Sequence, residues 1–127
     1  MAQNKLIYYL AVSRGSTVLA EYFVDKKCSQ FRDFTREIAN KIKVGKTVSE
    51  FDNYDYITER ESSSRDLIYI AVVQKGFNKS LGFQMIDTLK SRFEATVDAE
   101  IIKIARTLQF NPEFQAELKQ IHVALDL

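Results

Sequence analysis

The chain has 127 residues, of which 46% are hydrophobic and 28% are charged, with four glycines and one proline. This length and composition predict one domain spanning 1–127 and exclude disorder and repeat arrays. Its 18 basic and 17 acidic side chains give a net charge of +1, so no strong positive field favours nucleic acid or an anionic membrane. The single cysteine, Cys28, cannot form an internal disulfide and is compatible with a reducing compartment.

The first third of the chain predicts two strands and a helix. Branched and aromatic residues over 6–13 and 17–24 favour strands, and Gly15 between them suits a tight hairpin turn. The first strand is almost continuously apolar, which is typical of a central strand covered on both faces. Ser29 can cap the helix, and we expect Gly45 to end it. The apolar residues of this helix recur at helical spacing: Phe31, Phe34, Ile38 and Ile42.

Three further short strands are predicted, over 47–51, 54–58 and 67–73. Asp52-Asn53 suits the turn between the first two, because both residue types tolerate turn backbone. The third is apolar throughout, so we expect it to be a second central strand.

Helices are predicted over the remainder of the chain. One runs from Asn78 to about Ala95 with an apolar face. The segment 98–108 is ambiguous between a short helix and irregular chain. A final helix is marked by Asn111 as its cap and Pro112 at its first position.

This order of elements predicts an α+β fold. Two hairpins that flank a helix imply a sheet in which the first and fifth strands are neighbours. We expect a five-stranded antiparallel (mixed) sheet, with one helix on one face and two on the other.

Three segments resemble the longin domains of long vesicle-type (R-type) SNAREs of the endosomal and vacuolar class. LIYYLAVSRGSTVLAEY resembles the family's opening strand, Arg-Gly-Thr-like turn and second strand. GFQMIDTLKSRFEATV looks like the family's second long helix, and NPEFQAELKQI is similar to its last helix. The match spans nearly the whole chain, although KTVSEFDNYDYITE keeps the family's Asn-Tyr and lacks its usual histidine.

The resemblance implies a profilin-like longin fold that has no catalytic residues, metal or cofactor and that binds other proteins. In that family a groove between the first helix and the third strand clasps the protein's own SNARE segment or binds adaptors. Part of an apolar stripe left at a sheet edge is a suitable site for either occupant. Carried over by position, the groove wall is Phe34, Ile38 and Ile42 on the helix and Val48 and Phe51 on the strand.

The resemblance also implies a monomeric regulator of membrane fusion and sorting on the cytoplasmic face of vesicles, endosome, vacuole or Golgi. Its partners would be its own SNARE segment, other SNAREs and trafficking adaptors. We expect the SNARE heptads and any membrane anchor to lie outside this chain, because it holds no long series of heptads and no apolar run of roughly 18 residues. The alternatives are a structural subunit of a coat or tethering complex, a non-fusogenic longin protein, and a small enzyme on the same fold.

Catalytic and ligand motifs are weak in this sequence. The sole histidine, His122, has no second histidine or cysteine pair with which to form a metal site. The segment 43–47 ends like a phosphate-binding loop, but Asn40 stands where that motif needs its first glycine. The acidic residues over 52–61 are more typical of a solvated surface than of an acid-base pair. We therefore expect no catalytic activity.

Overall fold

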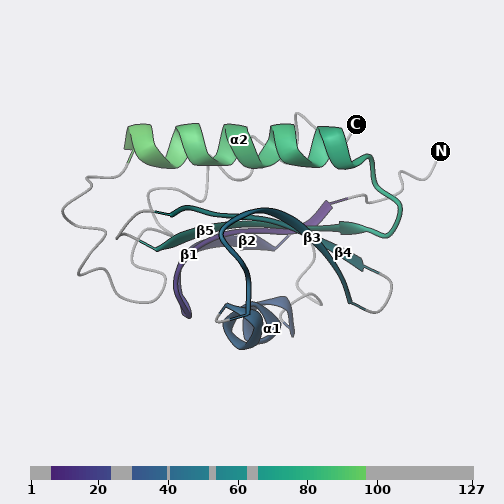
Figure 1. Ribbon diagram of the computed structural model, residues 1–127, viewed down its shortest axis with the longest axis horizontal. Helices are drawn as coiled ribbons and strands as arrows, with labels where there is room; N and C mark the ends of the chain where they lie inside the picture. The colour runs from purple at the N-terminus through teal and green to yellow at the C-terminus, as the bar shows by residue number, and fades with distance from the viewer. Residues whose placement is uncertain (1–6, 24–29, 40, 52–53, 63–65, 97–127) are drawn as a thin grey trace.

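The protein is described here by a computed structural model over residues 7–23, 30–39, 41–51, 54–62 and 66–96. A sheet lies between two helices, with α2 across its upper face and α1 against its lower face in Figure 1. The predicted α+β fold is therefore confirmed. The elements are β1 (Ile7–Arg14), β2 (Thr17–Phe23), α1 (Gln30–Ile38), β3 (Gly45–Phe51), β4 (Tyr54–Arg60), β5 (Leu67–Gln74) and α2 (Lys79–Thr96).

Several predicted features lie outside the described residues. They include the helix cap at Ser29, the cysteine Cys28, the ambiguous segment 98–108, the predicted final helix and His122.

The five strands form one antiparallel sheet in the order β2-β1-β5-β4-β3. The first and fifth strands are neighbours at its centre, as predicted from the element order. Both are apolar along almost their whole length because each is covered by α1 on one face and α2 on the other. At the two ends of the order lie β2 and β3, so each has one neighbouring strand within the part of the chain that the structure describes. The position of β3 at an edge determines what the groove can offer a partner.

Side-chain alternation along the strands builds two separate hydrophobic clusters, one on each face of the sheet. The cluster under α2 is mainly aliphatic: Ile7, Leu10, Val12, Leu19, Ala20, Ile57, Leu67, Tyr69, Ala71, Val73, Phe77, Met85, Ile86, Leu89 and Phe93. The cluster under α1 is richer in aromatic rings: Tyr9, Ala11, Val18, Phe31, Ala39, Tyr56, Ile68, Ile70 and Val72. The two faces therefore differ in chemistry as well as in the helix that covers them.

The long helix α2 begins with a side-chain cap and lies close to the sheet. Asn78 Oδ1 accepts a hydrogen bond of 3.0 Å from the backbone N–H of Leu81, as expected for a cap residue. Gly82 faces β4, and a Cβ atom added to it would stand 2.2 Å from Cδ1 of Ile57. The glycine thus allows a closer approach between helix and sheet than any larger residue would.

The short helix α1 ends earlier than predicted. It ends at Ile38, whereas Gly45 does not stop a helix but begins β3 with a φ of 104°. Beyond the helix, the N–H groups of Lys41 and Ile42 both bond to the carbonyl of Ile38, at 2.8 and 3.1 Å. This last turn keeps Ile42 at helical spacing from Ile38, which explains why the apolar repeat extends past the helix itself.

Candidate protein-binding groove

Two adjacent stripes of α1 have different degrees of burial. Phe31, Thr35 and Ala39 recur every four residues and are fully buried against the sheet. Phe34 and Ile38 form the neighbouring stripe, which is only partly buried. The sequence predicted a single apolar stripe, but the structure divides it between core packing and an accessible surface.

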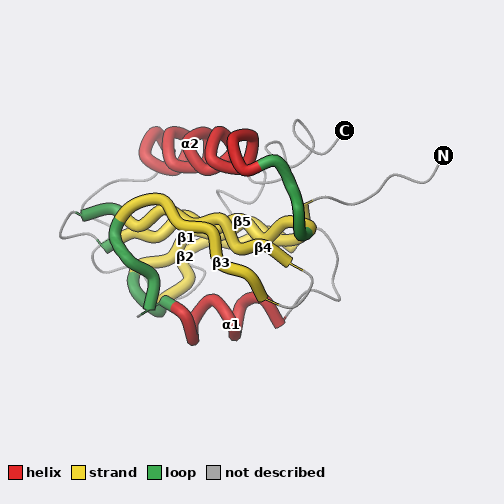
Figure 2. The backbone as a smooth tube through the Cα atoms, turned by 45° about the vertical axis from the view of Figure 1, so that its right-hand side comes forward, coloured by secondary structure: helices red, strands yellow, loops and turns green. Residues whose placement is uncertain are grey.

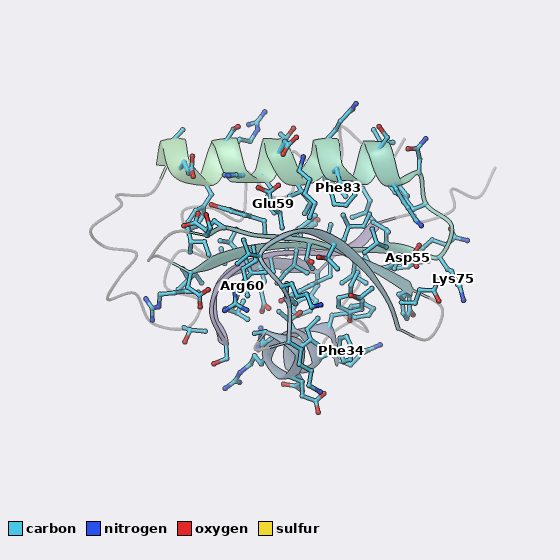
Figure 3. The ribbon with its side chains drawn as sticks, in the orientation of Figure 1. Phe34, Asp55, Glu59, Arg60, Lys75 and Phe83 are labelled. Carbon is cyan, nitrogen blue, oxygen red and sulfur yellow. The ribbon has the colours of Figure 1, made fainter. Side chains whose placement is uncertain are left out.

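The partly buried stripe lines a pocket of about 420 Å³ between α1 and the edge strand β3. We call this pocket the α1–β3 groove; its lining residues are Phe34, Ile38, Lys41, Ile42, Lys43, Thr47 and Ser49. Phe34 also contacts the core, because its ring centroid lies 4.8 Å from that of Tyr56 on β4. Figure 3 labels Phe34 on the helix below the sheet. The groove therefore has an apolar wall from α1 and a polar wall from β3.

The structure brings together three of the five residues proposed for the groove wall. Phe34, Ile38 and Ile42 line it, whereas Val48 packs against the aliphatic cluster on the opposite face of the sheet. Strand alternation is the reason, because neighbours along a strand point to opposite faces. Phe51 ends β3, and its side chain lies outside the described set.

Four lining residues were missed by the sequence-based reasoning: Lys41, Lys43, Thr47 and Ser49. The strand residues could have been identified from register. Only two residues separate β3 from β4, so Phe51 opposes Tyr54 and Ser49 opposes Tyr56. Since Tyr56 belongs to the α1-side cluster, the side chain of Ser49 must face α1.

Arg60, at the end of β4, holds the chain where it leaves α1. Its Nη1 donates to the carbonyl oxygens of Ala39 and Ile42, at 2.6 and 2.9 Å. Its Nε and Nη2 donate to the two carboxylate oxygens of Asp66, both at 2.8 Å. These bonds satisfy carbonyls left without helical partners where α1 ends. The same bonds hold Ile42 in the groove wall.

A second polar contact fixes the first half of α1 to β2. Glu21 is almost completely buried, and its Oε2 forms an ion pair with Arg32, whose Nε donates at 2.7 Å. The hydroxyl of Tyr9 donates to the other carboxylate oxygen at 2.8 Å. Burial and the neighbouring carboxylate raise the pKa of the Tyr9 hydroxyl well above its ordinary value. The hydrogen bond that Arg32 donates to Glu21 raises the pKa of the Arg32 guanidinium as well.

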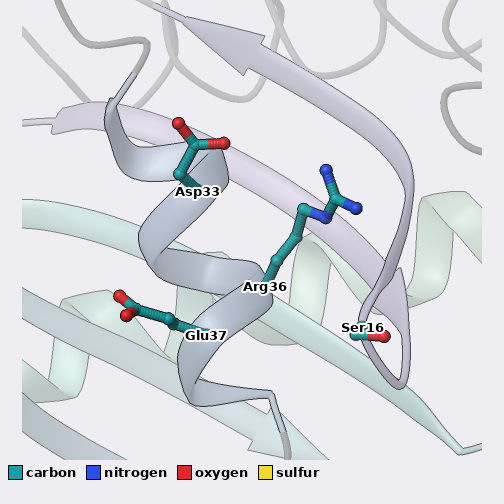
Figure 4. A pocket seen from close by; sticks show the side chains of 4 residues that line it. All are labelled: Ser16, Asp33, Arg36 and Glu37. Carbon is teal, nitrogen blue, oxygen red and sulfur yellow. The ribbon is translucent and has the colours of Figure 1, made fainter.

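A second pocket, of about 440 Å³, lies on the outer side of α1 and has a different character. It is lined by Ser16 of the β1–β2 turn and by Asp33, Arg36 and Glu37 of α1. Figure 4 shows these side chains, with Arg36 extending from the helix towards the β1–β2 hairpin. Both signs of charge are present, and none of its described lining residues is apolar, so this surface offers little for a protein partner to bury.

The acidic residues of β4 have structural partners instead of a reactive arrangement. Asp55 accepts a hydrogen bond of 3.1 Å from the backbone N–H of Gly76, and Glu59 pairs with Lys90 of α2 at 3.3 Å. Figure 3 labels both acidic residues, which lie on the α2 side of the sheet. Within the described parts of the chain, no group of three or more His, Cys, Asp or Glu residues could hold a metal ion. The helices described here include none long and apolar enough to cross a bilayer.

Comparison with known proteins assigns the family. The family model of the longin domain, described as a regulated-SNARE-like domain, matches residues 19–118. A search of curated proteins found no match. Among solved structures, the fold resembles that of the yeast R-SNARE Nyv1p, identified as a longin domain protein, with a TM-score of 0.61 and 12% identity. That alignment covers 97% of this chain and 89% of the other. The family model accounts for most of the sequence, and the chain therefore belongs to the longin family of SNARE-like domains.

Proposed function

We propose that this domain is the regulatory head of a vesicle SNARE and that the α1–β3 groove is its protein-binding site. In this proposal the groove binds the protein's own SNARE segment, which keeps the protein closed, or binds trafficking adaptors that direct its sorting. The domain acts on the cytoplasmic face of vesicles or endomembranes. Family membership supports a role in vesicle trafficking rather than catalysis.

The observation that carries this proposal is the partly buried apolar stripe of α1. Phe34, Ile38 and Ile42 border a pocket instead of being sealed in the core. Apolar side chains kept accessible beside a sheet edge are typical of a site that a partner covers. The pocket also lies next to β3, whose outer edge has no neighbouring strand among the described residues.

The first test concerns the full-length protein. The proposal predicts heptads with a central arginine, followed by an apolar anchor, in the sequence after this domain. Adding that SNARE segment in trans to isotope-labelled domain should shift the amide resonances of Ile38, Ile42 and their neighbours. No change at saturating segment would contradict closure of the protein through this groove.

A substitution tests the groove itself. Ile42→Ser should weaken binding of the segment about tenfold, because it removes apolar area from the groove wall. It should lower the free energy of unfolding only slightly, because Ile42 is partly exposed. The matched control is Ile57→Ser, a fully buried position under α2, which should destabilise the fold strongly. A similar large loss for Ile42→Ser would show instead that Ile42 belongs to the core.

A further inference from the structure

The lysines near β3 fall into two groups according to their partners. Lys46 extends to the α2 side, where its ammonium lies 3.9 Å from Asp87 and 5.7 Å from the Phe83 ring centre. Lys75 pairs with Glu50 of β3 at 3.8 Å. These contacts place the charges of β3 and its neighbours away from the α1–β3 groove.

The two lysines that line the groove have no such contact with the described residues. Lys41 and Lys43 are exposed, and neither forms an ion pair with any acidic residue that the structure describes. Glu37, one helical turn before Lys41, instead lines the polar pocket on the outer side of α1. The groove therefore combines an apolar wall with two positive charges that have no intramolecular acidic partner among the described residues.

The spacing along the groove can accommodate an extended segment, and the neighbouring edge strand favours one. Phe34 and Ile38 lie one helical turn apart, which is about 6 Å along the axis. Alternate side chains of an extended strand are about 6.7 Å apart, so they match this interval closely. The opposite wall is the edge strand β3. No described strand pairs with its outer backbone groups, so a strand from a partner could do so.

We infer that the α1–β3 groove takes an extended, acidic segment, which adds a sixth strand to the sheet beside β3. Every second side chain of the segment faces α1. Those beside Phe34, Ile38 and Ile42 are apolar, and those beside Lys41 and Lys43 are carboxylates. This inference rests on the proposed function, since it specifies the partner of the same groove.

The test uses seven-residue peptides, the length of β3. The first has Leu or Ile at its first and third positions, Glu at its fifth and seventh positions, and Ser between them, so that the apolar and acidic side chains share the face turned towards α1. The second replaces every Glu with Lys, and the third keeps the composition of the first but places the apolar residues at helical spacing. Binding is followed through amide resonances of the labelled domain. The first peptide should bind at least about tenfold more tightly than the other two at low salt, and high salt should reduce its advantage over the second.

Charge reversal identifies the lysines responsible. Lys41→Glu and Lys43→Glu should each weaken binding of the first peptide by about fivefold. The matched control is Lys79→Glu, which makes the same charge change at an exposed position of α2 and should leave affinity unchanged. Equal binding of acidic and basic peptides, with shifts at Ile38 and Ile42, would overturn the inference and leave the proposed groove in place.

Backbone methylation of the peptide distinguishes a strand from a helix. Methyl groups on the alternate N–H groups that face β3 should abolish binding, whereas methyl groups on the intervening N–H groups should be tolerated. Loss of binding from both patterns, with preference for the helically spaced peptide, would show that the occupant is a helix and overturn strand addition. Absence of shifts with every peptide and with the SNARE segment would contradict the proposed function as well.

Discussion

The two faces of the sheet are covered by helices of very different length. The faces also differ in how completely their apolar side chains are buried. On one face α2, with 18 residues, buries an aliphatic cluster and is tied to β3 and β4 by two lysine–carboxylate pairs. On the other, α1 has only nine residues and is held by Arg32 and Arg60. The second apolar stripe of this short helix borders an accessible groove. Figure 2 shows β3 above α1. If the proposed function holds, stability and recognition are separated between the faces.

The largest effect should come from breaking the α2 side. Leu89→Ala removes a fully buried side chain and should lower the free energy of unfolding by about 3 kcal/mol. Ile38→Ala, on the accessible stripe of α1, should cost about 1 kcal/mol, since this side chain is only partly buried. Urea denaturation of both variants measures the difference. Equal losses would show that the α1 face is sealed as tightly as the α2 face.

A smaller loss is expected where α1 is attached to β2. Arg32→Ala leaves the buried Glu21 carboxylate without this guanidinium and should cost about 2 kcal/mol. The value is below that of a fully buried pair because the Arg32 side chain is 37% exposed. Arg36→Ala, one turn further along α1 and exposed, should change stability by less than about 0.5 kcal/mol. Thermal unfolding that ranks the two variants equally would contradict a specific role for the Glu21–Arg32 pair.

The smallest effect concerns Tyr9 and pH. Its raised pKa means that the folded protein favours the neutral phenol, so this contribution to stability is complete below about pH 10 and is lost as pH rises through the folded-state pKa. Tyr9→Phe should cost about 1 kcal/mol at pH 7, because Glu21 loses one donor. The cost should shrink above about pH 10. Parallel stability curves for the two proteins across pH 7–11 would contradict this linkage.

Much of the fold could be predicted because local and global preferences agree. The apolar strands at 6–13 and 67–73 indicated their central positions, and Asn78 and Gly15 indicated a helix start and a turn. Gly45 misled because a glycine after an apolar repeat is typical of a helix end. The actual end of α1 depends on Arg60, which lies 21 residues from Ala39 in the sequence and captures its carbonyl. A local sequence pattern cannot predict a contact between residues so far apart in the chain.

The groove was only partly predictable for a related reason. Helical spacing was enough to find Phe34, Ile38 and Ile42, but it does not reveal that Phe31 lies on the adjacent, fully buried stripe. The pairing of β3 with β4 determines which β3 side chains face α1. Val48 was assigned to the groove without this register, which places it opposite Ile57 on the α2 side. The importance of Lys41 and Lys43 follows from the partners that other lysines have, which only the assembled structure shows.

Arg60 of β4 attaches one end of the groove to the sheet, because it binds the carbonyl groups of Ala39 and Ile42. A guanidinium presents its donors in a fixed plane, so binding two carbonyls and the Asp66 carboxylate at once sets the direction in which the chain leaves α1. Under the proposed function, an arriving segment finds Ile42 already in place. The entropy of ordering this turn is lost during folding rather than on association, which favours affinity from a small contact area. Arg60, which does not line the groove, thus orders one groove wall before any partner binds.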